Sequence, residues 1–184
     1  RMYKALINYN DLNQGTNRPF DKFNAETIYQ SKVLVSVLMK SVRDCIVDSG
    51  LYASYDENDL RKVIFFTLNV NNLPVLKNSY NASIFPFTGL ATDEMYLIRS
   101  ECYARQDKTN EAIDDLNTLL ETRWRKNTFV PFAAQNSGEA LAHILTERRK
   151  ELPFRGVRWT DLRRLNLEGE NIIPTRIMEG RTYS

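Results

Sequence analysis

Five side chains between residues 51 and 89 have the chemical types that bind sugars. They are Tyr52, Tyr55, Asn78, Tyr80 and Asn81. A sugar ring has an apolar face, on which a flat tyrosine ring can stack, and a rim of hydroxyls, to which an amide can hydrogen-bond. Tyrosines in loops also act as half-buried packing residues, so both roles stay open for each position. The surrounding segment is rich in asparagine and proline and is predicted to be loop-rich, which is where binding groups are usually placed.

The sequence contains no constellation that is typical of catalysis or metal binding. His143 is the only histidine, and without a nearby cysteine it is expected to pack or face solvent rather than hold a metal. No G-x-S-x-G motif presents a serine nucleophile. The acidic run 56–59 lacks the alternating ligands and the glycine of a calcium loop, which favours a turn or a helix cap. We therefore expect no enzyme activity and no metal, although a pair of glycosidase carboxylates depends on distances in space that the sequence does not give.

Arginines and acidic residues are interleaved between residues 147 and 166. The acids are Glu147, Glu151 and Asp161, and the arginines are Arg148, Arg149, Arg155, Arg158, Arg163 and Arg164. Because arginine pairs bidentately with carboxylates, the pattern predicts an ion-pair lattice between two helices. Phe154 and Trp159 would then be buried anchors, joined by a turn at Gly156. The alternative is an exposed basic stripe that binds polyanions.

The composition is that of an ordinary globular domain. The chain has 184 residues, is 42% hydrophobic and 26% charged, and carries a net charge of +2. It can therefore bury a core, and it gives no reason to expect a nucleic-acid partner. The apolar run 33–39 is too short to span a membrane, and no signal peptide is visible.

The candidate side chains must be positioned by the elements of the first half of the chain. Residues 1–20 are polar and turn-rich, which predicts a loop. From Asn24 to Val47 apolar residues recur at helical spacing, and Gly50 follows where a helix end favours glycine, so a long amphipathic helix is predicted. The insert that follows contains two β-prone pieces, 62–67 and 82–85.

Four more helices are predicted in the second half. They begin near Thr92, at Thr109 or Asn110, near Ser137 and near Val157. Thr92 is expected to cap the first of them, with Asp93 and Glu94 beside its positive end.

The first two of these helices have the spacing of a tetratricopeptide repeat. The matched packing positions are Tyr96, Ser100, Tyr103, Ala112 and Leu116. The small residues let two antiparallel helices approach closely, while the aromatic residues fill the groove between them. One such pair cannot bury its own outer face, so further helical pairs are expected from the rest of the chain or from upstream of it.

Three phrases in combination resemble the C-terminal signature of the SusD/RagB family. They are GLATDEMYLIRSECYAR from Gly89, EAIDDLNTLLETRW from Glu111 and ERRKELPFRGVRWTDLRRLN from Glu147. The resemblance implies a mainly α, tetratricopeptide-like fold with loop-rich, short-strand inserts. It implies that residues 1–184 are the C-terminal portion of a single domain whose upstream part is absent. In this portion the loop-rich insert would span about 51–89 and the helical repeat region about 90–166.

The same resemblance implies a function. Members of this family are lipoproteins of the outer-membrane surface that bind a nutrient, usually an oligosaccharide, and deliver it to a partner TonB-dependent transporter of the SusC type. The resemblance implies no catalysis, no cofactor, no nucleic-acid partner, and attachment to the membrane only through an upstream lipid anchor. Glycan contacts in the family are variable loop residues, so none is carried over by position. A helical-repeat scaffold that binds a protein partner without glycan is the alternative.

Overall fold

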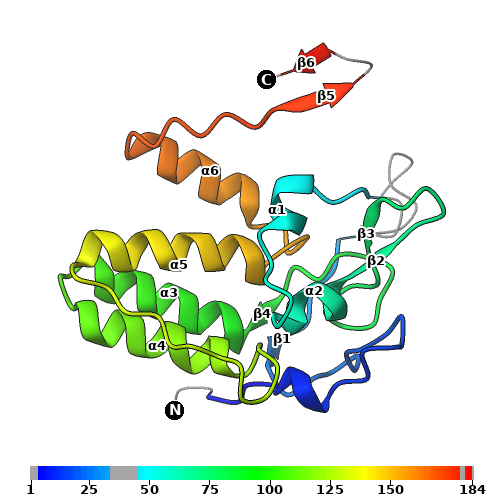
Figure 1. The fold of residues 1–184 in the computed structure, drawn as a ribbon, viewed down its shortest axis with the longest axis horizontal. Helices are drawn as coiled ribbons and strands as arrows, with labels where there is room; N and C mark the ends of the chain where they lie inside the picture. Colours follow the sequence, from blue (N-terminus) through cyan, green and yellow to red (C-terminus); the bar gives the residue numbers. More distant parts are fainter. Residues whose placement is uncertain (1–3, 34–44, 179–180, 184) are drawn as a thin grey trace.

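The computed structural model describes residues 4–33, 45–178 and 181–183, and most of its regular structure is helical (Figure 1). In chain order the elements are η1 (Tyr9–Asp11), β1 (Thr27–Tyr29), α1 (Ser49–Ala53), α2 (Leu60–Phe65), β2 (Phe66–Leu68), β3 (Pro74–Leu76), β4 (Leu90–Ala91), α3 (Thr92–Ala104), α4 (Thr109–Glu121), α5 (Ser137–Glu151), α6 (Arg158–Leu167), β5 (Arg176–Met178) and β6 (Arg181–Tyr183). The strands form short antiparallel pairs, β1 with β4, β2 with β3 and β5 with β6. The predicted fold class, mainly α with short-strand inserts, is confirmed.

The three long helices α3, α4 and α5 lie side by side and form one half of the molecule (Figure 1). The α3–α4 pair packs as the repeat spacing predicted. Ser100 and Ala112 are fully buried, and the Ser100 hydroxyl donates a hydrogen bond of 2.6 Å to the Ala112 carbonyl. Tyr96 is buried, and Tyr103 is half-buried against the same core. The small side chains therefore allow the close helix approach that the sequence indicated.

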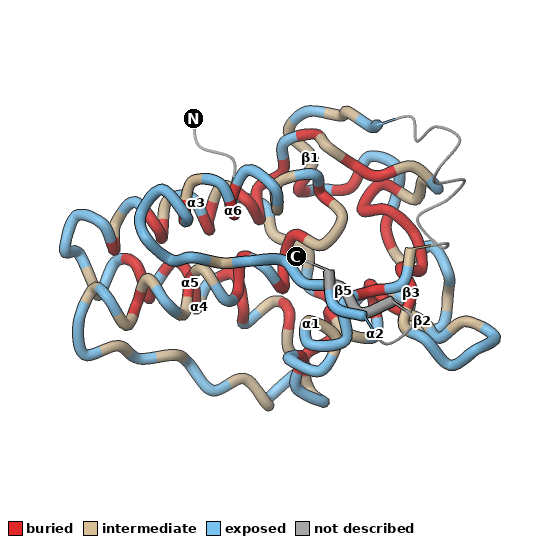
Figure 2. The backbone as a smooth tube through the Cα atoms, turned by 90° about the horizontal axis from the view of Figure 1, so that it is seen from above, coloured by how far each residue is buried: buried red, intermediate tan, exposed pale blue. Residues whose placement is uncertain are grey.

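The other half of the molecule contains the short strands, α1, α2 and an aromatic core. This core is built around Tyr9, Phe20, Phe65, Tyr80 and Phe87, whose rings meet edge-on or tilted with centroids 4.7–6.2 Å apart. Buried stretches of backbone run through both halves, whereas the outer loops are exposed (Figure 2). The chain therefore has two hydrophobic clusters, one aliphatic between the helices and one aromatic beside the strands.

A buried lattice of ion pairs joins these two clusters. The side chains of Arg61, Arg123 and Glu151 are fully buried, and Glu151 accepts from Arg61 at 3.2 Å and from Arg123 at 2.7 Å. Arg61 also pairs with Glu147, and Arg123 pairs with Glu26 at 2.9 Å. Because these residues come from α2, α5, the end of α4 and the segment before β1, the lattice ties distant parts of the chain together.

The predicted lattice of the segment 147–166 is confirmed, but Trp159 is not a core anchor, and Phe154 packs only partly buried against the aromatic core. Asp161 accepts from Arg148 at 2.9 Å and from Arg164 at 3.2 Å. Trp159, which was predicted to be buried, is 67% exposed, and Phe154 is only half-buried. The aromatic rings that lie against the buried arginines come instead from the first half of the chain, as with Tyr9 beside Arg123 and Tyr55 beside Arg61.

The long helix predicted over residues 24–47 is wrong wherever the structure describes it. Residues 27–29 form strand β1, which pairs with β4, and Gly50 lies inside α1 rather than after a helix. The reason is visible at Asn24, whose side chain accepts from the Glu26 amide and donates to the Tyr80 carbonyl. These bonds turn the chain before a helix could start. The rest of the prediction, residues 34–44, lies outside the described residues.

Three smaller predictions, two in the insert and one at α3, are also corrected. Residues 62–65 are helical rather than extended, because Asp59 caps α2 by accepting from the Arg61 amide. Residues 82–85 form a turn in which Ala82 has a φ of 57°. Thr92 is the first residue of α3 rather than its cap, and its hydroxyl instead donates to the Glu26 carbonyl.

Candidate functional site

The five residues predicted to bind a sugar do not form one exposed platform. Tyr55, Asn78, Tyr80 and Asn81 are buried, with exposed fractions of 2–6%, and Tyr52 is half-buried. The Tyr55 hydroxyl donates to the Lys150 carbonyl at 2.6 Å, and the Tyr80 hydroxyl donates to the Glu26 carboxylate. The structure therefore engages these two hydroxyls internally, and the aromatic platform expected in the insert is absent from its described residues.

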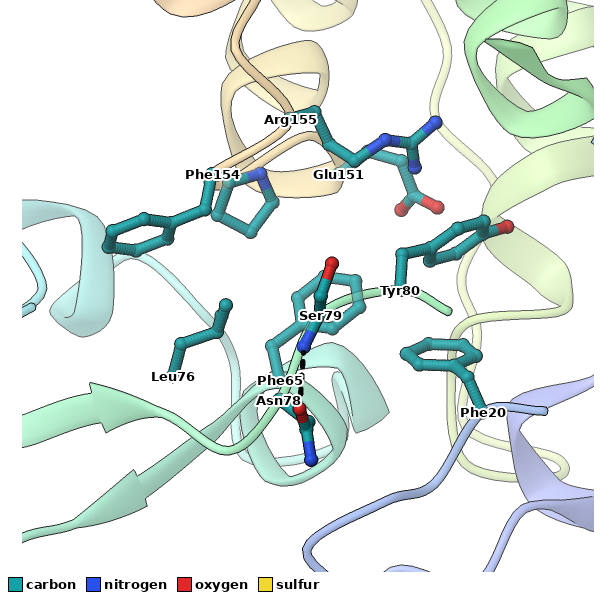
Figure 3. A pocket seen from close by; sticks show the side chains of 10 residues that line it. Phe20, Phe65, Leu76, Asn78, Ser79, Tyr80, Glu151, Phe154 and Arg155 are labelled. Atoms are coloured by element: carbon teal, nitrogen blue, oxygen red, sulfur yellow. Dashed lines mark hydrogen bonds between the residues drawn. The ribbon is translucent and has the colours of Figure 1, made fainter. Parts of the chain in front are cut away.

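Asn78 and Tyr80 line a small cavity beneath the loop that joins α5 to α6, and Phe154 and Arg155 of that loop line it as well (Figure 3). Its volume of about 20 Å³ is close to that of one water molecule and far below the space that a sugar ring needs. Figure 3 shows Arg155 reaching toward Tyr80 and Glu151 on one side of this loop, while Phe154 points the opposite way. The two neighbours in the loop thus extend in different directions, and Phe154 also lines a larger groove.

Arg155 anchors that loop to the aromatic core. It is buried, pairs with Asp93 at 3.0 Å, and lies 4.4 Å from the Tyr80 ring centroid and 4.7 Å from that of Phe87. A guanidinium over an aromatic face is held by the ring's negative quadrupole as well as by its ion pair. Tyr80 therefore helps to hold the loop in place through its contact with Arg155.

On the opposite side of the loop, an open groove of about 410 Å³ lies between α1, α5 and the first turn of α6; we call it the α5–α6 groove. Its floor and walls are mainly apolar, with contributions from Leu51, Leu152 and Val157. The volume lies in the range of small-molecule sites, which are typically apolar clefts with a few placed polar groups. Of the predicted site residues, Tyr52 is the nearest in sequence, next to Leu51 on α1.

Two aromatic side chains, Phe154 and Trp159, line the α5–α6 groove. Phe154 has a φ of 58°, a left-handed conformation that is strained for a bulky residue and that often marks functional positions. Gly156 follows with a φ of 80°, where a side chain would be strained. The loop geometry thus turns Phe154 toward the groove and starts α6 at its edge.

Trp159 presents the largest exposed aromatic surface at this groove. A tryptophan that is 67% exposed leaves apolar area in water, and its flat face is suited to stacking on a sugar. The helical period does not predict this exposure. A helix turns about 100° per residue, so Trp159 lies about 160° from the buried Asp161 and about 120° from the buried Leu165. It lies only about 60° from Leu162, which is also buried, so the spacing alone would place Trp159 beside the buried stripe.

Charged residues surround the apolar part of the α5–α6 groove. Arg149 pairs with Asp48 at 3.0 Å across its mouth, and Arg148 pairs with Asp161 at its base. Arg158 also lines the groove, and its side chain forms no hydrogen bond or ion pair with any residue that the structure describes. Burial lowers the pKa of Arg158, and the neighbouring Arg149 lowers it further. The rim of the groove therefore offers hydrogen-bond donors and positive charge.

Two other surface grooves fit a ligand less well. One of about 690 Å³ runs along α4, but two of the asparagine side chains that line it are already hydrogen-bonded to the protein backbone. The Asn117 side chain both donates to and accepts from the Phe132 backbone. The Asn10 side chain donates to the Trp124 carbonyl and accepts from the Lys126 amide. The other, of about 480 Å³, contains Asn81, whose side-chain oxygen accepts from the Ser83 amide. Neither groove is lined by an exposed aromatic face.

The buried acidic side chains Glu26 and Asp59 belong to the ion-pair lattice. Burial raises the pKa of Glu26 to about 7, although the Arg123 guanidinium opposes this shift. By contrast, Arg61 is the main group that holds the pKa of Asp59 below its usual value, against the effect of burial. Within the described ranges, no cluster of His, Cys, Asp and Glu side chains could hold a metal ion, and no helix is long and apolar enough to cross a membrane.

Comparison with known proteins shows what the chain resembles as a whole. The model of the SusD family matches residues 86–179. The fold is similar to that of a SusD-like carbohydrate-binding protein from Bacteroides vulgatus, with 17% identity and a TM-score of 0.61 over 98% of this chain and 43% of that chain. It is also similar to a SusD superfamily protein from Bacteroides fragilis, with 15% identity and a TM-score of 0.59 over 87% and 44% of the two chains.

No curated protein matches the chain. The chain spans less than half the length of these two solved structures. At 15–17% identity, the structural likeness concerns the fold.

Proposed function

Because the chain belongs to the SusD family, we propose that it binds an oligosaccharide nutrient without catalysing a reaction and that the α5–α6 groove holds part of this ligand. In this proposal the apolar face of one sugar ring lies on Trp159, and Phe154 lines the floor beside it. The arginines at the rim donate to hydroxyls of the sugar. The observation that carries the proposal is the exposed indole of Trp159 at the edge of a groove of about 410 Å³.

The chemistry of carbohydrate recognition supports this assignment. Sugars need a flat apolar surface and several hydrogen-bond donors close together, and the groove provides both. The structurally similar protein from Bacteroides vulgatus is a carbohydrate-binding protein, which agrees with this class of ligand. Each hydrogen bond to a hydroxyl replaces one to water, so we expect modest affinity that grows with the number of sugar units bound.

The remaining parts of the proposal concern the whole protein. We propose that it acts as a lipoprotein at the outer-membrane surface and delivers its ligand to a TonB-dependent transporter of the SusC type. Family membership supports both statements. Co-purification of such a transporter with the protein from outer membranes would test the partnership, and recovery of the protein without any transporter would argue against it.

We propose different roles for the residues first considered from sequence. Tyr55 and Tyr80 would support the groove from behind through their bonds to Lys150 and Glu26, and Asn78 and Asn81 would shape the turn between them. Tyr52 remains a candidate for contact with a longer ligand, since it lies on α1 beside the groove.

Calorimetric titration of the chain against a panel of plant and host oligosaccharides tests the proposed function. We expect at least one ligand to bind, and Trp159→Ala to weaken it about five- to twelvefold, because a stacking contact of about 1–1.5 kcal/mol is lost. Phe23→Ala is the matched control, since Phe23 is 68% exposed but does not line the groove. Binding that survives Trp159→Ala would move the site elsewhere, and capture of a protein partner with no glycan bound would favour the scaffold alternative.

A further inference from the structure

Arg148 has a buried donor without an acceptor at the base of the α5–α6 groove. The residue is 7% exposed and lines the groove. Its Nε donates to Asp161 at 2.9 Å and its Nη2 to Glu94 at 3.3 Å, but its Nη1 has no partner within the described part of the chain. Buried polar groups in folded proteins are almost always satisfied, so an orphaned guanidinium nitrogen beside an open groove points to a ligand that supplies the acceptor.

A second arginine in the groove has no direct ion pair, although Asp161 and Asp48 favour its charged form from a distance. Arg158 is half-buried and forms no ion pair with a described residue, while Arg149 nearby already pairs with Asp48. Both acids that line the groove are engaged, Asp48 by Arg149 and Asp161 by Arg148 and Arg164. Burial and the positive charge of Arg149 make the charged form of Arg158 less favourable and lower its pKa. Bound negative charge would relieve that cost.

The start of α6 adds donors at the same place. Its N-cap residue, Val157, contributes no side-chain hydrogen bond to the first turn. Uncapped backbone amides at a helix N-terminus carry partial positive charge and favour an anion. Asp161 lies in this first turn, but its two carboxylate oxygens accept from Arg148 and Arg164. The helix start therefore strengthens a site whose main support is the buried donor of Arg148.

We propose that the sugar held in the α5–α6 groove carries an anionic oxygen group, a carboxylate or a sulfate, which Arg158 and Arg148 bind while the ring lies on Trp159. This inference rests on the proposed function and narrows its ligand to acidic glycans. The planar guanidinium fork matches the oxygens of either group, and such charge-assisted bonds are about twice as strong as neutral ones. A neutral hydroxyl could accept one hydrogen bond but would leave Arg158 without a direct ion pair.

The test compares tetrasaccharides that carry a carboxylate, its neutral methyl ester or a sulfate. The probes are a galacturonic acid tetrasaccharide, its fully methyl-esterified form, and a sulfated galactose tetrasaccharide that lacks carboxylates. We expect an acidic probe to bind at least about tenfold more tightly than the methyl ester, and this preference to shrink at high salt. A preference for the uronate identifies a carboxylate as the group bound, and a preference for the sulfated probe identifies a sulfate.

Two arginine variants in α6 test which residue causes the preference for the acidic probe. Arg158→Gln should abolish most of the preference for the acidic probe, whereas Arg163→Gln, which removes the same charge from an exposed position outside the groove, should change it by less than about twofold. Circular dichroism and thermal melting confirm that both variants fold.

Each outcome separates the inference from the proposed function. Equal binding of the acid and its methyl ester, with sensitivity to Trp159→Ala, would overturn the anionic group and leave the sugar site standing. A charge preference that Arg158→Gln leaves intact would overturn the assignment to this groove. Failure of every acidic and neutral glycan to bind would overturn the proposed function itself.

Discussion

Replacement of Glu151 by glutamine should destabilise the protein strongly, because this carboxylate bridges two fully buried arginines. It accepts from Arg61 at 3.2 Å and from Arg123 at 2.7 Å, and all three side chains are inaccessible to solvent. Breaking a buried ion pair usually costs about 3–5 kcal/mol, because a charge is left uncompensated. We expect about 3 kcal/mol, since Arg61 keeps Glu147 and Arg123 keeps Glu26.

The free energy of unfolding is measured by urea titration followed by circular dichroism. For a chain of this size, about 3 kcal/mol corresponds to a fall in melting temperature of about 6–12 °C. Glu168→Gln is the matched control, because it makes the same chemical change in an exposed pair, with Arg105 at 2.7 Å, where about 0–1 kcal/mol is expected. If the two variants differed by less than about 1 kcal/mol, the buried lattice would not be what joins the two cores.

Three further substitutions test other parts of the structure. Ala112→Leu should overpack the α3–α4 contact with Ser100 and cost about 1–3 kcal/mol; an unchanged melting temperature would contradict the repeat packing. Gly89→Ala should destabilise more than an average core substitution, because its Cβ would lie 1.9 Å from the Tyr29 carbonyl oxygen, and a wild-type melting curve would refute that close approach. Burial raises the pKa of Glu26 from 4.5 to about 7, so its contribution to stability is present below about pH 4.5 and is lost as the pH rises through 7. Glu26→Gln should therefore remove part of the loss of stability between pH 5 and 8, and identical pH profiles for the two proteins would oppose this assignment.

Local patterns were enough to predict the helical half of the fold. The spacing of Ser100 and Ala112 indicated their contact because both lie on consecutive helices joined by a short turn. The start of α5 at Ser137 also depends on local sequence, because the Asn136 side chain caps the helix by accepting from the Glu139 amide. By contrast, residues 27–29 became a strand because of pairing with β4, more than 60 positions away, which a periodic run of apolar residues does not reveal.

The candidate site was harder to predict because burial depends on distant partners. The tyrosines of the insert have the right chemistry for a sugar, but Tyr55 and Tyr80 find their acceptors at Lys150 and Glu26, 95 and 54 positions away. Trp159 was assigned to the core because arginine-rich segments with aromatic residues often pack inward. The helical period does not reveal its exposure, because the buried Leu162 lies one turn further along α6, and the groove beside it depends on how α1 and α5 come together.

Tryptophan fluorescence in a Trp124→Phe variant tests most directly whether a sugar lies on Trp159. The chain has two tryptophans, so this variant leaves Trp159 as the single reporter. Trp124 packs against Phe129 at 5.8 Å outside the groove, and phenylalanine keeps an aromatic ring there. With an oligosaccharide that binds in calorimetry, we expect a saturable shift of the Trp159 emission, reduced quenching by acrylamide, and the same dissociation constant by both methods. Calorimetric binding that leaves the emission and the quenching of Trp159 unchanged would contradict the account.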